Sequence, residues 1–105
     1  MNDPIVNEGP PYERILRAAQ ARAILDVLMK ELSSNSQVIA SWLAALGIPA
    51  TAQSLTDLVD RLEAEGLVSV RQVGDVKVLQ LREAGGEVAA GIQTRDWIAR
   101  PALPK

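Results

Sequence analysis

The side chains that most often perform chemistry in proteins are missing from this chain, which contains neither histidine nor cysteine. Histidine is the usual general base near neutral pH and a frequent metal ligand, and cysteine supplies thiolate nucleophiles and metal ligands. The closest carboxylate pairs, Glu63 with Glu65 and Glu83 with Glu87, have no neighbouring nucleophile and base to act with, so we interpret them as solvated charges. We therefore predict that the protein is not an enzyme, and we expect no catalytic residue, metal site or cofactor.

Binding chemistry is better represented, in a helix expected between residues 51 and 66. Its side turned away from the core carries polar groups suited to DNA bases, since Gln can pair with adenine and Arg with guanine. These candidate nucleic-acid-binding residues are Gln53, Ser54, Thr56 and Arg61. Asp57 and Asp60 share that side and would repel a polyanion. An ordinary solvated helix face is the alternative explanation for each of these residues.

Two further candidate nucleic-acid-binding residues, Arg71 and Lys77, fall in a predicted β-hairpin. They could contact the phosphate backbone or reach the minor groove. Two cations on an exposed hairpin would also serve solubility and protect the sheet edge, so both explanations stay open.

The overall charge gives no support to nucleic-acid binding, because 13 acidic residues outnumber 11 basic ones and the net charge is −2. Between Ser36 and Gly66 four carboxylates accompany a single cation, Arg61, whereas cations outnumber acids from Ser69 to the end. Any phosphate contact is therefore expected at the hairpin and the tail rather than at the helix.

The first predicted helix runs from Tyr12 to Leu32, a segment without Gly or Pro that is rich in Ala, Leu, Arg and Glu. Its apolar residues change face, because Ile15 and Leu16 lie nearly opposite the stripe that ends at Leu32. Either the helix breaks near Ala21 or its first half packs against something else, such as a second subunit in a homodimer. The candidate interface residues are Tyr12, Ile15, Leu16 and, in the tail, Trp97, which could instead close the domain against this helix.

Two more predicted helices form a helix-turn-helix. The first follows the polar segment 33–36, whose last members can cap it, and ends near Leu46 with Gly47 as its stop. Its apolar residues recur at helical spacing and predict one buried face that includes a structural Trp42: Val38, Ile39, Trp42, Leu43 and Leu46. The second helix is capped by Thr51, stops at Gly66 and buries Leu55, Leu58, Val59 and Leu62.

The remaining elements complete an α+β fold, a mostly helical winged helix-turn-helix with a two-stranded β-hairpin wing. Residues 67–72 and 76–81 are rich in Val and predict the hairpin, with its turn at Gly74 and Asp75. A short last helix is expected from Arg82 to Gln93. Residues 1–11, rich in Pro, predict a flexible arm before the winged-helix domain at 12–93, and 94–105 predict a docked tail.

Several of these segments resemble a known family. Residues 62–68 (LEAEGLV), 81–91 (LREAGGEVAAG) and the Arg-Pro-x-x-Pro tail at 100–104 are similar to the small ArsR-like winged-helix proteins of Mu-like phages and prophages. The likeness covers residues 19–105 and departs from the wider winged-helix pattern at Arg82, where a Thr commonly precedes the last helix. The resemblance implies a winged-helix fold and a phage source, and leaves the activity open.

Two functions from different classes follow as expectations. The first is a phage-encoded winged-helix DNA-binding protein, such as a transcriptional regulator, with double-stranded DNA as partner. The second is a winged-helix module that binds a phage packaging or morphogenesis protein, or a host factor.

No apolar run approaches the roughly 20 residues that span a bilayer, and the N-terminus lacks the features of a signal peptide. We therefore expect no membrane partner and a cytoplasmic location in the bacterial host.

Overall fold

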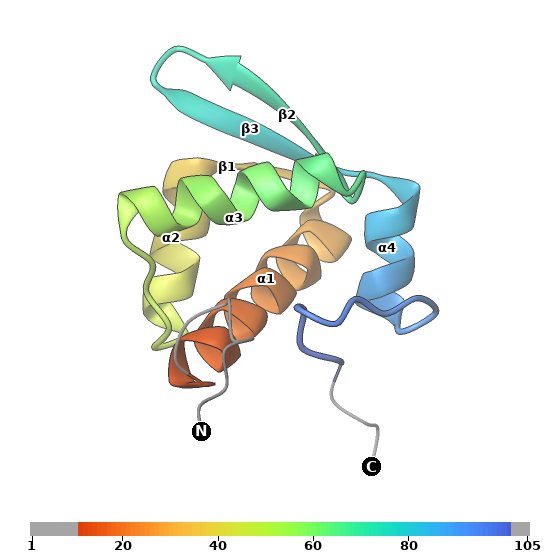
Figure 1. Ribbon diagram of the computed structural model, residues 1–105. Helices are drawn as coiled ribbons and strands as arrows, with labels where there is room; N and C mark the ends of the chain where they lie inside the picture. Colours follow the sequence, from red (N-terminus) through yellow and green to blue (C-terminus); the bar gives the residue numbers. More distant parts are fainter. Residues whose placement is uncertain (1–10, 102–105) are drawn as a thin grey trace.

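The computed structural model describes residues 11–101, which form four helices and a three-stranded antiparallel sheet (Figure 1). In chain order the elements are α1 (Pro11–Glu31), β1 (Ser33–Asn35), α2 (Ser36–Ala45), α3 (Ala52–Ala64), β2 (Val68–Val73), β3 (Val76–Leu81) and α4 (Glu83–Ala90). The predicted α+β class is confirmed, and this order is compatible with a winged helix. The predicted arm lies outside the described residues except for Pro11, which begins α1.

The sheet is larger than the predicted two-stranded wing, because β1 pairs with the far side of β3. In the predicted hairpin β2 pairs antiparallel with β3, from Val68 opposite Leu81 to Val73 opposite Val76. On the other side Ser33 lies opposite Gln80 and Ser34 opposite Leu79. The prediction missed β1 because its residues, Ser33–Asn35, are all polar. A strand this short forms through main-chain hydrogen bonds to a neighbour, which side-chain patterns do not record.

The long first helix is continuous, so the predicted alternative of a break near Ala21 is wrong. Burial changes along it instead: Tyr12 is 72% exposed and Ile15 is 66% exposed, whereas Ala21 is fully buried. Leu16 is half-buried. The second half of α1 contributes Ile24, Leu25 and Leu28 to the core, where they meet apolar residues of α2, α3 and the sheet.

The helix-turn-helix pair begins with the predicted caps. The Asn35 Oδ1 atom accepts a hydrogen bond of 2.9 Å from the Val38 amide at the start of α2. Thr51 Oγ1 accepts one of 3.0 Å from the Ser54 amide at the start of α3. Between the two helices, the Nε2 group of Gln20 donates to the carbonyl oxygens of Ile48 and Pro49, at 3.1 Å each. Gln20 itself is 1% exposed, and its two partly buried hydrogen bonds attach the turn to α1.

The structure corrects the prediction that Trp42 lies in the core. Trp42 is 41% exposed, and among the described residues of α2 only Ile39 and Leu43 are buried. The stripe of five apolar residues is wider than the side that α2 packs against its neighbours. Its outer members, Val38, Trp42 and Leu46, consequently face solvent.

The segment after α4 returns to the helices, within the part of the predicted tail that the structure describes, residues 94–101. Ile98 is buried in the core, and the Ala99 amide donates to the carbonyl oxygen of Ala18 on α1 at 3.1 Å. Arg82 precedes α4 but makes no side-chain capping bond. This is the position at which a Thr is common in winged-helix proteins. Within residues 11–101 no helix is long and apolar enough to cross a membrane.

Candidate functional site

The outward side of α3 uses its polar side chains mainly within the helix itself. The Gln53 Nε2 group donates to Asp57 Oδ1 at 2.9 Å, one turn later. The hydroxyl of Thr56 donates to the carbonyl oxygen of Ala52 at 3.0 Å and is thereby directed along the helix. Both side chains would have to exchange these partners before they could contact a base edge.

Exposed carboxylates dominate this side of α3. Asp57, Asp60 and Glu63 are all exposed, and the wing brings one cation to them. Lys77 Nζ on β3 lies 3.7 Å from Asp60 Oδ1, with the two side chains 32% and 62% exposed. An ion pair this accessible to water is weak, at most about 1 kcal/mol. Its orientation nevertheless turns the charge of Lys77 toward α3.

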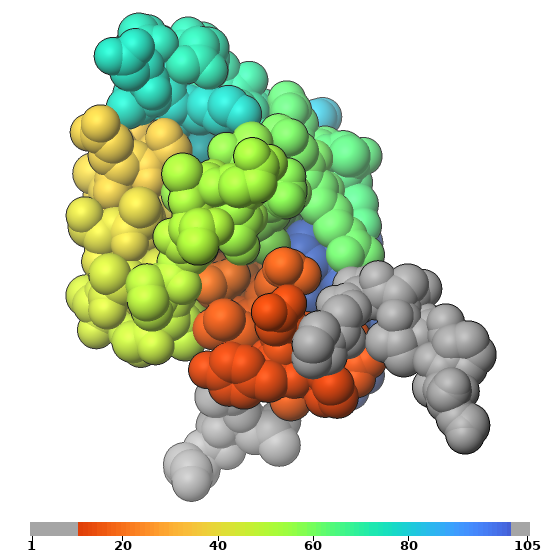
Figure 2. All heavy atoms as spheres, turned by 60° about the vertical axis from the view of Figure 1, so that its left-hand side comes forward, coloured from red at the N-terminus to blue at the C-terminus, as the bar shows by residue number. Residues whose placement is uncertain are grey.

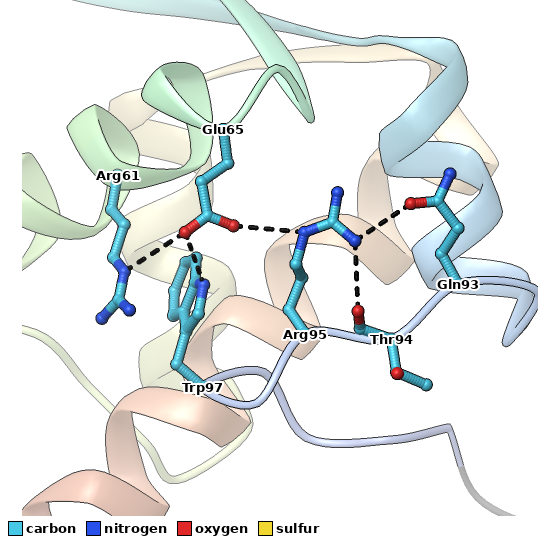
Figure 3. A network of polar contacts seen from close by, with 6 residues as sticks. All are labelled: Arg61, Glu65, Gln93, Thr94, Arg95 and Trp97. Carbon is cyan, nitrogen blue, oxygen red and sulfur yellow. Dashed lines mark hydrogen bonds and ion pairs between the residues drawn. The ribbon is translucent and has the colours of Figure 1, made fainter.

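The third-helix cation, Arg61, is directed toward the C-terminal tail (Figure 3). Its guanidinium carbon lies 4.2 Å from the ring centroid of Trp97, a cation–π geometry. Its Nε atom is 3.6 Å from Glu65 Oε2, which also accepts a 3.0 Å hydrogen bond from the Trp97 indole. Arg61 is therefore part of a side-chain network that joins α3 to the tail.

Arg95 completes this network from the tail. Its Nε atom lies 3.3 Å from Glu65 Oε1, an ion-pair distance, although that oxygen accepts no hydrogen bond with good geometry from the described residues. Its Nη1 group donates to Gln93 Oε1 at 2.9 Å and to the carbonyl oxygen of Thr94 at 3.1 Å. Glu65 is half-buried between two arginines and a tryptophan, so its interpretation as a solvated charge is wrong.

A groove of about 740 Å³ lies beside this network, between the first turns of α1, α3 and the tail. Its walls include Arg14 and Arg17 from α1, Ser54 and Asp57 from α3, and Trp97. The groove therefore mixes cations with carboxylates.

Comparison of the chain with protein-family models, with curated proteins and with solved structures found no match. The sites must accordingly be judged from their own geometry.

The six candidate DNA-binding residues do not form one surface. Ser54 and Arg61 line the groove near the tail, whereas Gln53 and Thr56 are engaged within α3. On the hairpin, Lys77 faces Asp60, while Arg71 is exposed and forms no side-chain hydrogen bond or ion pair with any other described residue. Their assignment to DNA stays a prediction.

The four candidate interface residues differ in exposure and do not all face solvent. Tyr12 and Ile15 are exposed on α1, and Leu16 is half-buried. Trp97 is half-buried within its own chain and packs against the core, with its indole nitrogen on Glu65 of α3. The sequence could not reveal Glu65 as the anchor of the tail, because its partner Trp97 lies 32 residues further along the chain.

Proposed function

We propose that this protein is a winged-helix protein-interaction module whose third helix binds a positively charged protein surface. The winged-helix assignment is supported by the order of its elements, with two short helices followed by a β-hairpin. The observation that carries the proposed function is the exposure of Asp57 and Asp60 on the outward side of α3. A fold alone does not set the ligand, so the charges of this surface decide between partners.

DNA fits this surface less well than a basic protein does. Phosphate contacts need cations, and two of the cations at α3 already face carboxylates: Lys77 faces Asp60, and Arg61 lies beside Glu65. A basic protein surface would instead gain from Asp57 and Asp60, and these charges would also steer its approach. The resemblance to phage winged-helix proteins supports a search among phage packaging or morphogenesis proteins and host factors.

The test is affinity capture from phage-infected cells on the immobilised full-length chain, with nuclease present. We expect the wild type to retain a stoichiometric protein that an Asp57→Asn, Asp60→Asn variant loses. A Glu13→Gln, Glu31→Gln variant removes the same charge from exposed positions of α1 and should retain that protein. Equal capture by the α3 variant, or no stoichiometric protein on the wild type, would contradict the proposal.

DNA binding is the second candidate, and the exposed Arg71 on β2 is the observation that favours it. Fluorescence anisotropy of labelled phage-genome fragments and of a scrambled duplex, at low and near-physiological salt, separates the two candidates. The interaction module predicts no binding even at low salt. Tight, salt-resistant binding to one fragment would support the DNA candidate, for which Arg71→Ala with Lys77→Ala should weaken binding to every sequence.

A further inference from the structure

The groove of about 740 Å³ between the first turns of α1, α3 and the tail has a positively charged wall on α1. Arg14 and Arg17 form this wall, three residues apart and therefore on the same side of the helix. Both are exposed. Figure 2 shows the early part of α1, in orange, directly beneath α3, in green, on one face of the molecule. The arginine wall is thus accessible to a ligand in the groove.

The two guanidinium groups of the arginine wall are only weakly engaged by the described residues. Arg14 forms no side-chain hydrogen bond or ion pair with any other described residue. Arg17 Nη2 lies 3.9 Å from Glu13 Oε1, with the two side chains 48% and 54% exposed. An ion pair this accessible to water contributes at most about 1 kcal/mol. An acidic group in the groove can therefore replace Glu13 at little cost.

The other walls define what else a ligand must present. Ile15 of α1, Leu58 of α3 and Trp97 of the tail add apolar surface. Asp57 and Asp96 also line the groove, and Asp57 already accepts a hydrogen bond from within α3. A short peptide fits these walls if it carries apolar side chains and places its acidic groups against the arginine wall.

The chain itself contains such a peptide. Two segments, 1–10 and 102–105, lie outside the described residues. Residues 1–10 carry two carboxylates, Asp3 and Glu8, with apolar residues between them and no Lys or Arg. Residues 102–105 carry Lys105 and no carboxylate. Of these two segments, only the first complements the arginine wall in charge.

We propose that residues 1–10 of the same chain occupy this groove, with their two carboxylates toward Arg14 and Arg17. The segment joins α1 at Pro11, which begins the helix. Arg17 follows Pro11 by about 9 Å along the helix axis, whereas ten residues can span up to roughly 33 Å. The segment is therefore long enough to turn back at Gly9 and pass both arginines.

Attachment to α1 distinguishes this segment from a free acidic peptide. A short covalent link raises the concentration of a segment at a neighbouring site to the millimolar range. Ion pairs between exposed groups contribute at most about 1 kcal/mol each, which would not retain a free peptide. The same weak contacts suffice for a segment that is already held beside the groove.

The inference goes beyond the proposed function and does not depend on it. It concerns the contact between the N-terminal segment and α1, and its test uses the purified chain alone. The proposed function is tested by capture of a partner on variants of α3. Failure of either proposal therefore leaves the other standing.

Paramagnetic relaxation locates the segment in the full-length chain by nuclear magnetic resonance. The chain has no cysteine, so a nitroxide attached to an Asn2→Cys variant is its single label. We expect the label to broaden the amide signal of Ser54 and the indole signal of Trp97, two residues that line the groove. Asp3→Asn combined with Glu8→Gln should reduce this broadening at least about threefold, because the two ion pairs are lost.

Variants of the arginine wall assign the effect to the groove. Arg14→Gln combined with Arg17→Gln should reduce the broadening as much as removal of the two carboxylates does. Arg71→Gln removes the same charge from an exposed residue of β2 and should leave the broadening unchanged. Circular dichroism of each variant checks that it remains folded.

A mixed sample identifies the chain that supplies the segment. Nitroxide-labelled chain without nitrogen-15 is mixed with nitrogen-15 chain without nitroxide, and we expect no broadening. Broadening in the mixture would overturn the proposal, because a segment from a second copy would then occupy the groove. The proposal would equally fail if the labelled parent chain showed no broadening at Ser54 and Trp97, or if removal of the carboxylates or of the arginines left it unchanged.

Discussion

Gly85 and Gly86 are neighbours in α4 with opposite steric requirements. A Cβ atom added at Gly85 would lie 2.1 Å from the main-chain oxygen of Leu67 and 2.9 Å from Leu81 Cδ1. A Cβ atom added at Gly86 would make only ordinary contacts, at 3.7 Å from Leu81 Cδ2 and 3.8 Å from Met29 Sδ. Close packing of α4 against the start of the hairpin therefore requires glycine at one position and tolerates alanine at the next.

The two substitutions should consequently change stability in opposite directions. We expect Gly85→Ala to lower the free energy of unfolding by about 3 kcal/mol, because main-chain atoms must move apart. Gly86→Ala should raise it by about 0.5 kcal/mol, since alanine is the better helix former. Urea unfolding followed by circular dichroism measures both values. Equal effects of the two variants would show that α4 does not approach Leu67 this closely.

At the scale of elements, α4 is held to α1 by an arginine at its C-terminal end. The Arg22 Nη1 group donates to the carbonyl oxygen of Val88 at 3.2 Å, and Nη2 donates to that of Ala89 at 2.6 Å. Nη2 also lies 2.8 Å from Asp26 Oδ1, and the Arg22 side chain is only 13% exposed. The last carbonyl groups of a helix lack intrahelical partners, and a cation there is stabilised by the helix dipole.

Removal of the Arg22 side chain should lower the stability of the fold. We predict that Arg22→Met, which keeps most of the aliphatic length, lowers the free energy of unfolding by about 2 kcal/mol, because the Ala89 carbonyl group loses its donor and the Val88 carbonyl group keeps only the Gly91 amide. Arg17→Met is the matched control on the same helix, where the arginine is 48% exposed and lies 3.9 Å from Glu13. It should change stability by less than about 0.5 kcal/mol. Chemical denaturation compares them, and similar values would refute a capping role for Arg22.

At the scale of the whole molecule, the tail ties the C-terminal end of the described chain to α1 and α3. Ile98 enters the core, and Trp97 joins Glu65 and Arg61. These contacts link segments that are far apart in the sequence, so they depend on the complete fold. They also account for the position of Arg61, which lies beside the tail instead of projecting from the outward side of α3.

Loss of the Trp97 ring should therefore loosen the tail. We expect Trp97→Ala to lower the free energy of unfolding by about 2 kcal/mol, and Trp97→Phe to cost about half as much because an aromatic ring remains under Arg61. Ile92→Ala, at a residue that is 74% exposed, should have little effect. Hydrogen exchange of the Ala99 amide, which donates to Ala18 on α1, should accelerate in Trp97→Ala. Unchanged exchange would mean that Trp97 does not hold the tail.

Local patterns in the sequence were sufficient for most elements. The buried residues of α3, the caps Asn35 and Thr51, and the hairpin turn at Gly74 and Asp75 all occur where their spacing predicted them. Each of these depends on a few neighbouring residues, because helical periodicity, N-terminal capping and turn conformation are short-range effects. The α+β class follows from their order.

The tertiary structure decided which side of each element is covered. It paired the polar strand β1 with β3, left Trp42 of α2 exposed, and directed Arg61 and Glu65 toward a tryptophan from the tail. None of these outcomes follows from local spacing, because burial and side-chain partners depend on segments distant in the chain. For the same reason the sequence predicted the acidic outward side of α3, whereas only the fold showed that Arg61 lies beside the tail and that α2 leaves apolar side chains exposed.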